Sequence, residues 1–214
     1  MTVVYRRNLP HIHPSHATFF VTFRLAGSLP LEVIEQLREE FQAEERRLKQ
    51  TQSGTALRIE RYKIQKKLFG RYDEWLDRLA AGPAWLRQPE VAQIVMDEIQ
   101  RLDGTHYDLL ACCIMPNHVH LLVDMARFDH PESKDHPSAL SHALHLLKGR
   151  TARYANQCLA RRGKFWQDES YDHVVRDEAE LQRIFWYIIN NPVKAGLVTD
   201  WQEWPYTFVA QIVQ

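Results

Sequence analysis

Cysteine is scarce in this chain of 214 residues, and its three cysteines are badly placed for cross-linking. Cys112 and Cys113 are adjacent and Cys158 lies far along the chain, so the sequence has neither a CxxC pair nor the even set that a disulfide framework uses. The spacing speaks against a cysteine-based zinc module and favours a reducing environment.

Long hydrophobic runs are also missing. No apolar segment approaches the roughly 18 residues of a membrane-spanning helix. The first residues, MTVVYRRNLPHIH, lack the apolar stretch of a signal peptide. We therefore expect a cytoplasmic protein that has no membrane partner.

An excess of charge of either sign is absent, because 27 Lys and Arg residues balance 27 Asp and Glu residues. The field of the whole protein will not drive strong nonspecific binding to duplex DNA, so any contact with nucleic acid must be local. Positive side chains cluster in 5–7, 58–67 and 148–164. Each cluster is either a local nucleic-acid contact or a solvated helix face.

What is present is the composition of a folded domain: 45% of the residues are hydrophobic, 11% aromatic and 25% charged. We expect one domain spanning residues 1–214. Periodicity and turn residues predict the following elements: strand 17–25, helices 31–50, 56–80 and 88–102, strands 107–114 and 118–123, helix 138–158, strand 171–176 and helix 178–189. Without the first two helices, this order is the split βαβ pattern of a ferredoxin-like α+β sandwich, with an antiparallel sheet and helices on one face.

The central chemical feature is the His118-Val119-His120 motif inside an apolar strand. Side chains alternate along a strand, so both imidazoles point the same way, with Cα atoms about 7 Å apart. Two polar rings on a buried face need a partner, and one divalent cation could serve both. Two separately hydrogen-bonded histidines remain the alternative.

Two other histidine pairs compete with this motif. His11 and His13 have the same spacing, but Pro10 and Pro14 flank them and favour an extended loop with a structural or exposed role. His142 and His145 can share a helix face, which is a common surface arrangement.

The final helix offers further polar groups. Tyr187 and Asn191 are four residues apart and share a face at the border of the apolar stripe formed by Leu181, Ile184, Phe185 and Ile188. Pro192 should end this helix. From this pattern alone, Tyr187 could equally be a packing residue with its hydroxyl at the surface.

Several blocks of the sequence resemble the REP-associated tyrosine transposases, which are single-tyrosine members of the HUH endonuclease superfamily. The blocks are Met115-Pro-Asn-His-Val-His-Leu-Leu-Val123, Phe165-Trp-Gln167, Tyr171-Asp-His-Val-Val-Arg-Asp-Glu178 and Tyr187-Ile-Ile-Asn-Asn-Pro-Val-Lys-Ala-Gly-Leu-Val198, with Tyr5-Arg-Arg7 and Phe19-Phe-Val-Thr-Phe-Arg24 near the start. The resemblance fails over about 35–84, where we expect a helical insertion.

The resemblance implies that His118, His120 and Asn191 hold a divalent metal, Mg²⁺ or Mn²⁺, and that Tyr187 is the nucleophile. It implies a DNA transposase or endonuclease that cleaves and rejoins single strands near palindromic hairpins through a 5′-phosphotyrosine intermediate. The partner would be single-stranded or hairpin DNA, bound by a monomer or a homodimer. A free tyrosine has a pKa near 10, and the sequence does not identify a base for it.

Residues beyond this set are candidates for DNA contact. Lys148, Arg150 and Arg153 could bind phosphates, and Tyr154, Phe165 and Trp166 could stack on unpaired bases, although core packing is the alternative for the aromatic residues. His173 and Arg176 recur in the family block, where a structural hydrogen bond and a DNA contact are equally plausible roles.

Two other functions are compatible with parts of the pattern. A zinc hydrolase could use His118 and His120, but such sites draw on further His and Asp ligands, and no HxHxDH pattern follows His118. A catalytically silent protein that binds nucleic-acid hairpins is the alternative from another class. The combination of two histidines, Tyr187 and Asn191 argues against it, since binding alone does not need a tyrosine beside two metal ligands.

Overall fold

A computed structural model describes residues 2–6, 10–78, 82–129 and 137–211. The chain divides into two compact units. The first consists of Met1–Ala26 and Ala84–Gln214, and the second is Gly27–Pro83. The sequence predicted one domain with a helical insertion at about 35–84, so the second unit begins somewhat before the predicted insertion.

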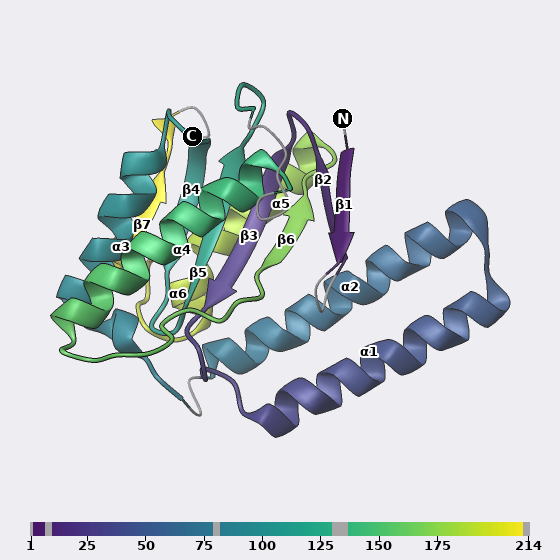
Figure 1. Ribbon diagram of the computed structural model, residues 1–214, viewed down its shortest axis with the longest axis horizontal. Coiled ribbons are helices and arrows are strands. Elements are labelled where there is room, and N and C mark those ends of the chain that lie inside the picture. Colours follow the sequence, from purple (N-terminus) through teal and green to yellow (C-terminus); the bar gives the residue numbers. More distant parts are fainter. Residues whose placement is uncertain (1, 7–9, 79–81, 130–136, 212–214) are drawn as a thin grey trace. The chain divides into compact units, whose positions relative to one another are not determined.

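The first unit is built on a five-stranded sheet with the order β6-β3-β5-β4-β7 (Figure 1). All neighbouring strands are antiparallel. The strands are β3 (Thr18–Arg24), β4 (Asp108–Ile114), β5 (His118–Asp124), β6 (Tyr171–Val174) and β7 (Thr207–Val209). The first four strands along this sheet have the ferredoxin-like arrangement, so the predicted α+β class is confirmed. The edge strand β7 was not predicted, because a run of three residues carries little periodic signal.

The two faces of the sheet bury different side chains. Helices α3 (Pro89–Leu102) and α4 (Ala139–Cys158) cover one face, where Val21, Val119 and Leu121 join Val95 and Leu147 in the main hydrophobic core. Helix α5 (Glu178–Ile189) packs against β4 and β5 on the opposite face (Figure 1). The expectation that all helices lie on one face was therefore wrong, because the strands are apolar on both sides and need cover on both.

An additional hairpin precedes the main sheet. Strand β1 (Thr2–Arg6) pairs antiparallel with β2 (Pro10–Pro14), and Val3 lies opposite His13. The prediction of an extended loop at His11 and His13 was wrong. Both prolines lie at the ends of β2, where a missing backbone N–H is tolerated in an edge strand.

The second unit is a helical hairpin of α1 (Leu31–Thr51) and α2 (Gly54–Asp77), close to the two helices predicted here. Its inner face buries Val33, Leu37 and Phe41, which recur at the four-residue spacing of one helix face. The side chain of Glu45 forms an ion pair with Arg61 across the hairpin, with an N–O distance of 2.7 Å.

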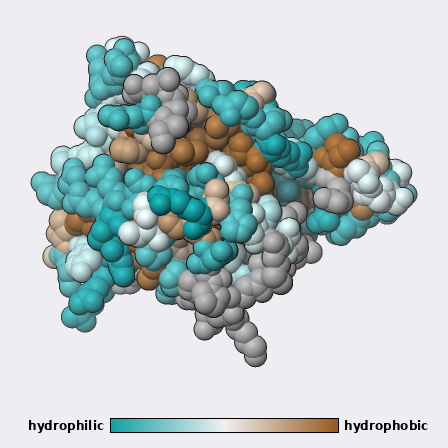
Figure 2. All heavy atoms as spheres, turned by 90° about the horizontal axis from the view of Figure 1, so that it is seen from above, coloured by the Kyte–Doolittle hydropathy of each residue, from teal (hydrophilic) through white to brown (hydrophobic). Residues whose placement is uncertain are grey.

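The surface can be described for one face of the molecule. Figure 2 shows hydrophilic residues over most of one face, with a hydrophobic area among them.

The remaining described elements are three short helices. They are the 3₁₀ helices Trp85–Arg87 and Trp201–Glu203 and the helix α6 (Asn191–Lys194). Within the described ranges, no helix combines the length and the apolar character needed to cross a membrane.

Candidate active site

The side chains of His118 and His120 lie side by side on the α5 face of strand β5. Both are buried, with exposed fractions of 1% and 0%. Their Nε2 atoms are 3.0 Å apart and their ring centroids 4.6 Å apart. The alternation along one strand therefore brings the two ring nitrogens to a single point, as the sequence pattern predicted.

The other nitrogen of each ring is held by a neighbouring polar side chain. His118 Nδ1 lies 2.6 Å from Asn117 Oδ1, and His120 Nδ1 lies 2.7 Å from Thr22 Oγ1 on strand β3. When Nδ1–H donates to these oxygens, each Nε2 carries a lone pair that faces the other ring. This pattern of outer hydrogen bonds is typical of metal-ligating histidines.

The side-chain amide of Asn191 completes the group. Its Nδ2 lies 2.5 Å from His120 Nε2, and the residue is fully buried. Its Oδ1 is buried and has no hydrogen-bond partner within the part of the chain that the structure describes. Exchange of the amide nitrogen and oxygen places an oxygen donor beside the two imidazole nitrogens. Two nitrogens and one amide oxygen form a donor set that suits a divalent cation.

The electrostatic environment keeps His120 neutral. Burial and, to a smaller extent, the positive charge of Lys194 lower the pKa of His120 to about 3. The imidazole therefore stays unprotonated at neutral pH, and its Nε2 lone pair is available. Metal binding by histidine requires this neutral form.

Tyr187 lies beside the histidine pair. Helix α5 begins after Asp177, whose side chain accepts a hydrogen bond from the backbone N–H of Glu180 at 2.7 Å. Tyr187 occupies the last turn of α5 and is half-buried. Its ring contacts His120 edge to face, with a centroid separation of 5.6 Å. A tyrosine that is accessible and adjacent to a candidate metal site is suited to be a nucleophile.

The chain changes direction between Tyr187 and Asn191. Helix α5 ends at Ile189, and the four-residue helix α6 begins at Asn191. The prediction that Pro192 ends the helix is correct for α5, although Pro192 itself lies in the first turn of α6, where proline is favoured. The structure brings Tyr187 and Asn191 to the same side of the sheet as the two histidines.

The basic residues of α4 that were predicted to contact DNA each have a different partner in the protein. The ammonium group of Lys148 donates to the backbone oxygens of Gln167 and Asp168, at 2.7 and 3.0 Å. Arg150 forms an ion pair with Glu98 at 3.3 Å. Arg153 is exposed next to the ring of Tyr154, which is itself 51% exposed. Arg150, Arg153 and Tyr154 thus all lie at the surface, and Glu98 engages Arg150.

The remaining candidates for DNA contact differ in exposure. Trp166 is 4% exposed, and its indole N–H donates to Thr151 Oγ1 at 2.8 Å, so packing accounts for its position. His173 is also buried and lies 3.2 Å from the carboxylate of Glu180. The side chain of Arg176 is exposed. Direct contact with DNA stays a prediction for His173 and Arg176, as it does for the three basic residues of α4.

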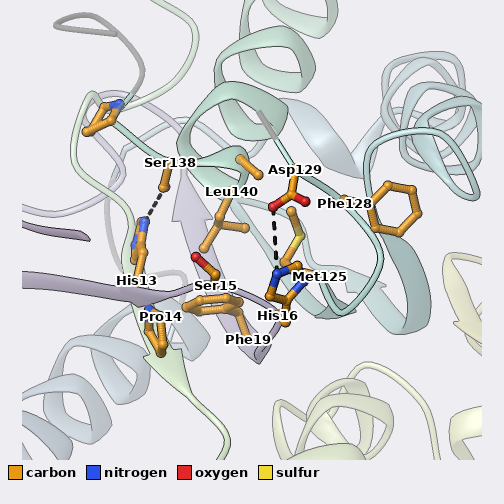
Figure 3. A pocket seen from close by; sticks show the side chains of 12 residues that line it. His13, Pro14, Ser15, His16, Phe19, Met125, Phe128, Asp129, Ser138 and Leu140 are labelled. Atoms are coloured by element: carbon orange, nitrogen blue, oxygen red, sulfur yellow. Dashed lines mark hydrogen bonds and ion pairs between the residues drawn. The ribbon is translucent and has the colours of Figure 1, made fainter. Parts of the chain in front are cut away.

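The competing histidine pairs lie apart from the candidate site. His13 connects β2 to Ser138 at 2.6 Å and to Asp172 at 2.9 Å, and the side chain of His11 lies outside the described residues. Figure 3 shows His13 and Ser138 among the side chains that line a pocket. Met125, which also lines it, follows β5 at the end opposite to His118. His142 stacks on His106, with a centroid separation of 5.8 Å. None of these residues adjoins the His118 and His120 rings.

Sequence reasoning missed three residues of the site. Thr22 is the one polar residue within the run Phe19–Phe23, which is a weak signal that its face of the strand carries polar groups. Asn117 precedes the histidine motif directly, but its contact with His118 depends on the turn. Lys194 lies in the Asn-Pro-Val-Lys block, but the sequence pattern indicates no function for its ammonium group.

Comparison with known proteins relates part of the chain to a family of transposases. Residues 89–191 match the family described as "Transposase IS200 like". This segment contains the two histidines, Tyr187 and Asn191. The resemblance to tyrosine transposases that the sequence motifs indicated is therefore confirmed for this part of the chain.

One curated relative carries the more particular name. The chain is 29% identical over 109 residues to a Haemophilus influenzae protein named "Putative REP-associated tyrosine transposase". The alignment covers 47% of this chain and 58% of that protein. The chain thus spans little more than half the length of this relative.

A solved structure shares the fold. It is described as a REP-associated tyrosine transposase bound to a REP hairpin, and it aligns with a TM-score of 0.50 and 16% sequence identity. The alignment covers 95% of this chain and 80% of that chain. At this identity the likeness concerns the arrangement of helices and strands.

Proposed function

We propose that this protein is a metal-dependent single-tyrosine DNA endonuclease and strand transferase. The observation that carries the proposal is the convergence of His118 Nε2, His120 Nε2 and the buried amide of Asn191 at one point beside Tyr187. The match to the IS200-like transposase family over 89–191 supports the same reaction class.

In the proposed reaction Tyr187 is the nucleophile. The phenol oxygen of Tyr187 attacks the phosphorus of a scissile phosphodiester and forms the Tyr–O–P bond, while the bond from phosphorus to the 3′ oxygen breaks. The phenol proton leaves to solvent, and the 3′ oxygen takes up a proton to become a free hydroxyl. The phosphodiester energy is retained in the 5′-phosphotyrosine, so a strand can be rejoined without ATP.

The donor set suits a divalent cation, and Mg²⁺ or Mn²⁺ is the proposed ion. His118, His120 and Asn191 would hold the ion, which when bound would orient the scissile phosphate and withdraw charge from its non-bridging oxygens. Thr22 and Asn117 would keep the two rings in the tautomer that presents Nε2. Neither residue needs to move for this, because both hydrogen bonds are already present.

Hairpin or single-stranded DNA from palindromic repeats is the proposed substrate. The name of the Haemophilus influenzae relative and the REP hairpin bound to the structural relative support it. Exposed Arg153 and Arg176 are the proposed phosphate contacts, and Tyr154 is a proposed stacking surface. A cytoplasmic location and a monomeric or homodimeric state remain predictions from the sequence.

Formation of a covalent adduct tests the proposal. We would incubate the purified full chain with end-labelled single-stranded hairpins and Mn²⁺ or Mg²⁺, and separate the products on a denaturing gel. A covalent protein–DNA species should form with the wild-type chain and disappear with Tyr187→Phe or a chelator. Hairpin affinity should persist in Tyr187→Phe, because the substitution removes one hydroxyl.

The alternative function is that of a hairpin-binding protein without catalysis. Tight hairpin binding by the wild-type chain, without an adduct on any palindromic strand and with either metal, would support this alternative. Tyr206→Phe is a matched control, since it removes a tyrosine hydroxyl near β7 and should leave adduct formation unchanged.

A further inference from the structure

Lys194 has a defined place next to the candidate site but no role in the reaction described so far. It is the last residue of α6, three positions after Asn191, so one short helix carries both. Its Nζ lies 5.6 Å from the centroid of the Tyr187 ring. The separation is within the range of a cation–π contact.

The charge of Lys194 also acts on His120, one of the proposed metal ligands. The positive charge contributes to the lowered pKa of His120, which places the ammonium group within electrostatic range of that ring. Lys194 is exposed, whereas His120 and Asn191 are fully buried. The lysine ammonium group is thus accessible to solvent beside the half-buried ring of Tyr187.

The positive charge of Lys194 matters because negative charge develops on the phosphate during the reaction. The three proposed ligands are two imidazoles and an amide, so none of them carries a negative charge. During attack by the phenol oxygen, negative charge accumulates on the non-bridging oxygens of the phosphate. A lysine ammonium group, charged at neutral pH, can contact one of these oxygens from the side facing the nucleophile.

We propose that Lys194 is a catalytic residue whose ammonium group donates a hydrogen bond to a non-bridging oxygen of the scissile phosphate as Tyr187 attacks. This inference rests on the proposed function. The ammonium group keeps all its protons in the step, so the balance of bonds and protons in the cleavage is unchanged. Its contribution is stabilisation of charge in the transition state, which acts on the rate more than on affinity.

Single-turnover cleavage at a saturating concentration of hairpin DNA separates an effect on the cleavage rate from an effect on DNA affinity. Lys194→Met keeps the long apolar stem and removes the charge, so the rate of adduct formation should fall about 100- to 1,000-fold, as for the loss of one transition-state donor. Lys194→Arg should recover part of the rate. The hairpin dissociation constant, measured by fluorescence anisotropy with Ca²⁺, should change only a few-fold.

Arg127→Met is the matched control. Arg127 is exposed and pairs with Asp108 at the beginning of β4, about 20 Å along the sheet from the His118 end by the rise per strand residue. The variant loses one positive charge and should keep the wild-type rate. Equal thermal midpoints for both variants and the wild type would exclude a loss of folding as the cause.

The outcomes distinguish the inference from the proposed function. A wild-type rate in Lys194→Met, or a slow reaction that saturating DNA fully restores, overturns the role of Lys194 and leaves the nuclease proposal intact. A wild-type chain that forms no adduct overturns both. A rate lowered at saturation by Lys194→Met, with partial recovery by Lys194→Arg, supports the inference.

Discussion

At the scale of single residues, two outer hydrogen bonds determine how the imidazole rings present their nitrogens. The hydroxyl of Thr22 lies 2.7 Å from His120 Nδ1, and the amide oxygen of Asn117 lies 2.6 Å from His118 Nδ1. Without these hydrogen bonds each ring could rotate or adopt the other tautomer. Nε2 would then no longer always be the nitrogen that offers a lone pair to a metal. The outer contacts therefore belong to the site as much as the ligands do.

Thr22→Val tests this dependence. The substitution keeps the shape of the side chain and removes the oxygen next to His120 Nδ1. We expect the dissociation constant for Mn²⁺ to rise about 10- to 100-fold, which is typical for loss of an outer-shell partner. Isothermal titration calorimetry on the purified full chain measures this constant directly.

A control on the same strand is available in Thr18→Val. Thr18 lies on the same face of β3 as Thr22 but at its other end, where its hydroxyl is 3.4 Å from Asp124. This variant should bind Mn²⁺ as the wild type does. Equal affinities for the wild type and Thr22→Val would show that the hydroxyl does not orient His120.

The common direction of the two histidine rings could be predicted from the sequence, whereas their supporting contacts could not. Alternation within one strand is a local rule, so the common direction of His118 and His120 follows from their spacing. The pairing of Thr22 with His120 depends on the register between β3 and β5, which joins residues 98 positions apart. No periodicity within either strand carries that information.

At the scale of elements, the N-terminal hairpin is tied to the first unit through one histidine. His13 on β2 accepts a hydrogen bond from Ser138, the N-cap of α4, and donates to Asp172 on β6. The side chains of His13 and Asp172 are 2% and 5% exposed. One buried ring therefore joins two strands and a helix.

His13→Ala should lower the free energy of unfolding by about 2–4 kcal/mol, because the buried carboxylate of Asp172 loses the hydrogen bond from His13. Urea denaturation followed by circular dichroism gives this value. His145→Ala, on the exposed side of α4, should change it by about 0.5 kcal/mol or less. A His13 variant as stable as the His145 variant would contradict a connecting role.

The helices were predicted more closely than the short strands. Helix α5 has the predicted bounds, since its apolar residues repeat at helical spacing and Asp177 provides an N-cap. Strand β2 was mistaken for a loop because Pro10 and Pro14 outweighed the alternation between them. Its pairing partner β1 supplies the hydrogen bonds, and that partner is not visible in the β2 sequence itself.

At the scale of the whole molecule, every residue of the main core cluster belongs to the first unit. These residues come from its strands, helices and loops, and none lies within Gly27–Pro83. The two ends of the second unit meet closely: a Cβ on Gly82, with φ +82°, would come within 2.1 Å of the Gly27 carbonyl oxygen. A short linker can therefore replace the hairpin.

We predict that a chain with Gly27–Pro83 replaced by Gly-Ser-Gly still folds cooperatively. The ends that the linker joins are close, and the buried cluster of the first unit remains complete. Thermal unfolding followed by near-ultraviolet circular dichroism should give one sharp transition. Loss of that signal together with dye binding by exposed apolar surface, as in a molten globule, would contradict the prediction.

A positive reference for core loss is Val95→Asp in the full chain, because it places a charge among fully buried side chains. Its unfolding should lack the sharp transition. The deletion variant should resemble the wild type and not this reference. The comparison therefore separates loss of the helical unit from damage to the core.

The 3.0 Å separation of the two Nε2 atoms bears on how a bound ion would exchange with solution. Residue spacing on strand β5 gives both rings one direction, and the contacts with Thr22 and Asn117 hold their outer nitrogens. A cation bound here would therefore not have to organise the backbone. The ion could then exchange with solution while the polypeptide stays folded, unlike the structural zinc of a small finger domain, whose departure unfolds the chain.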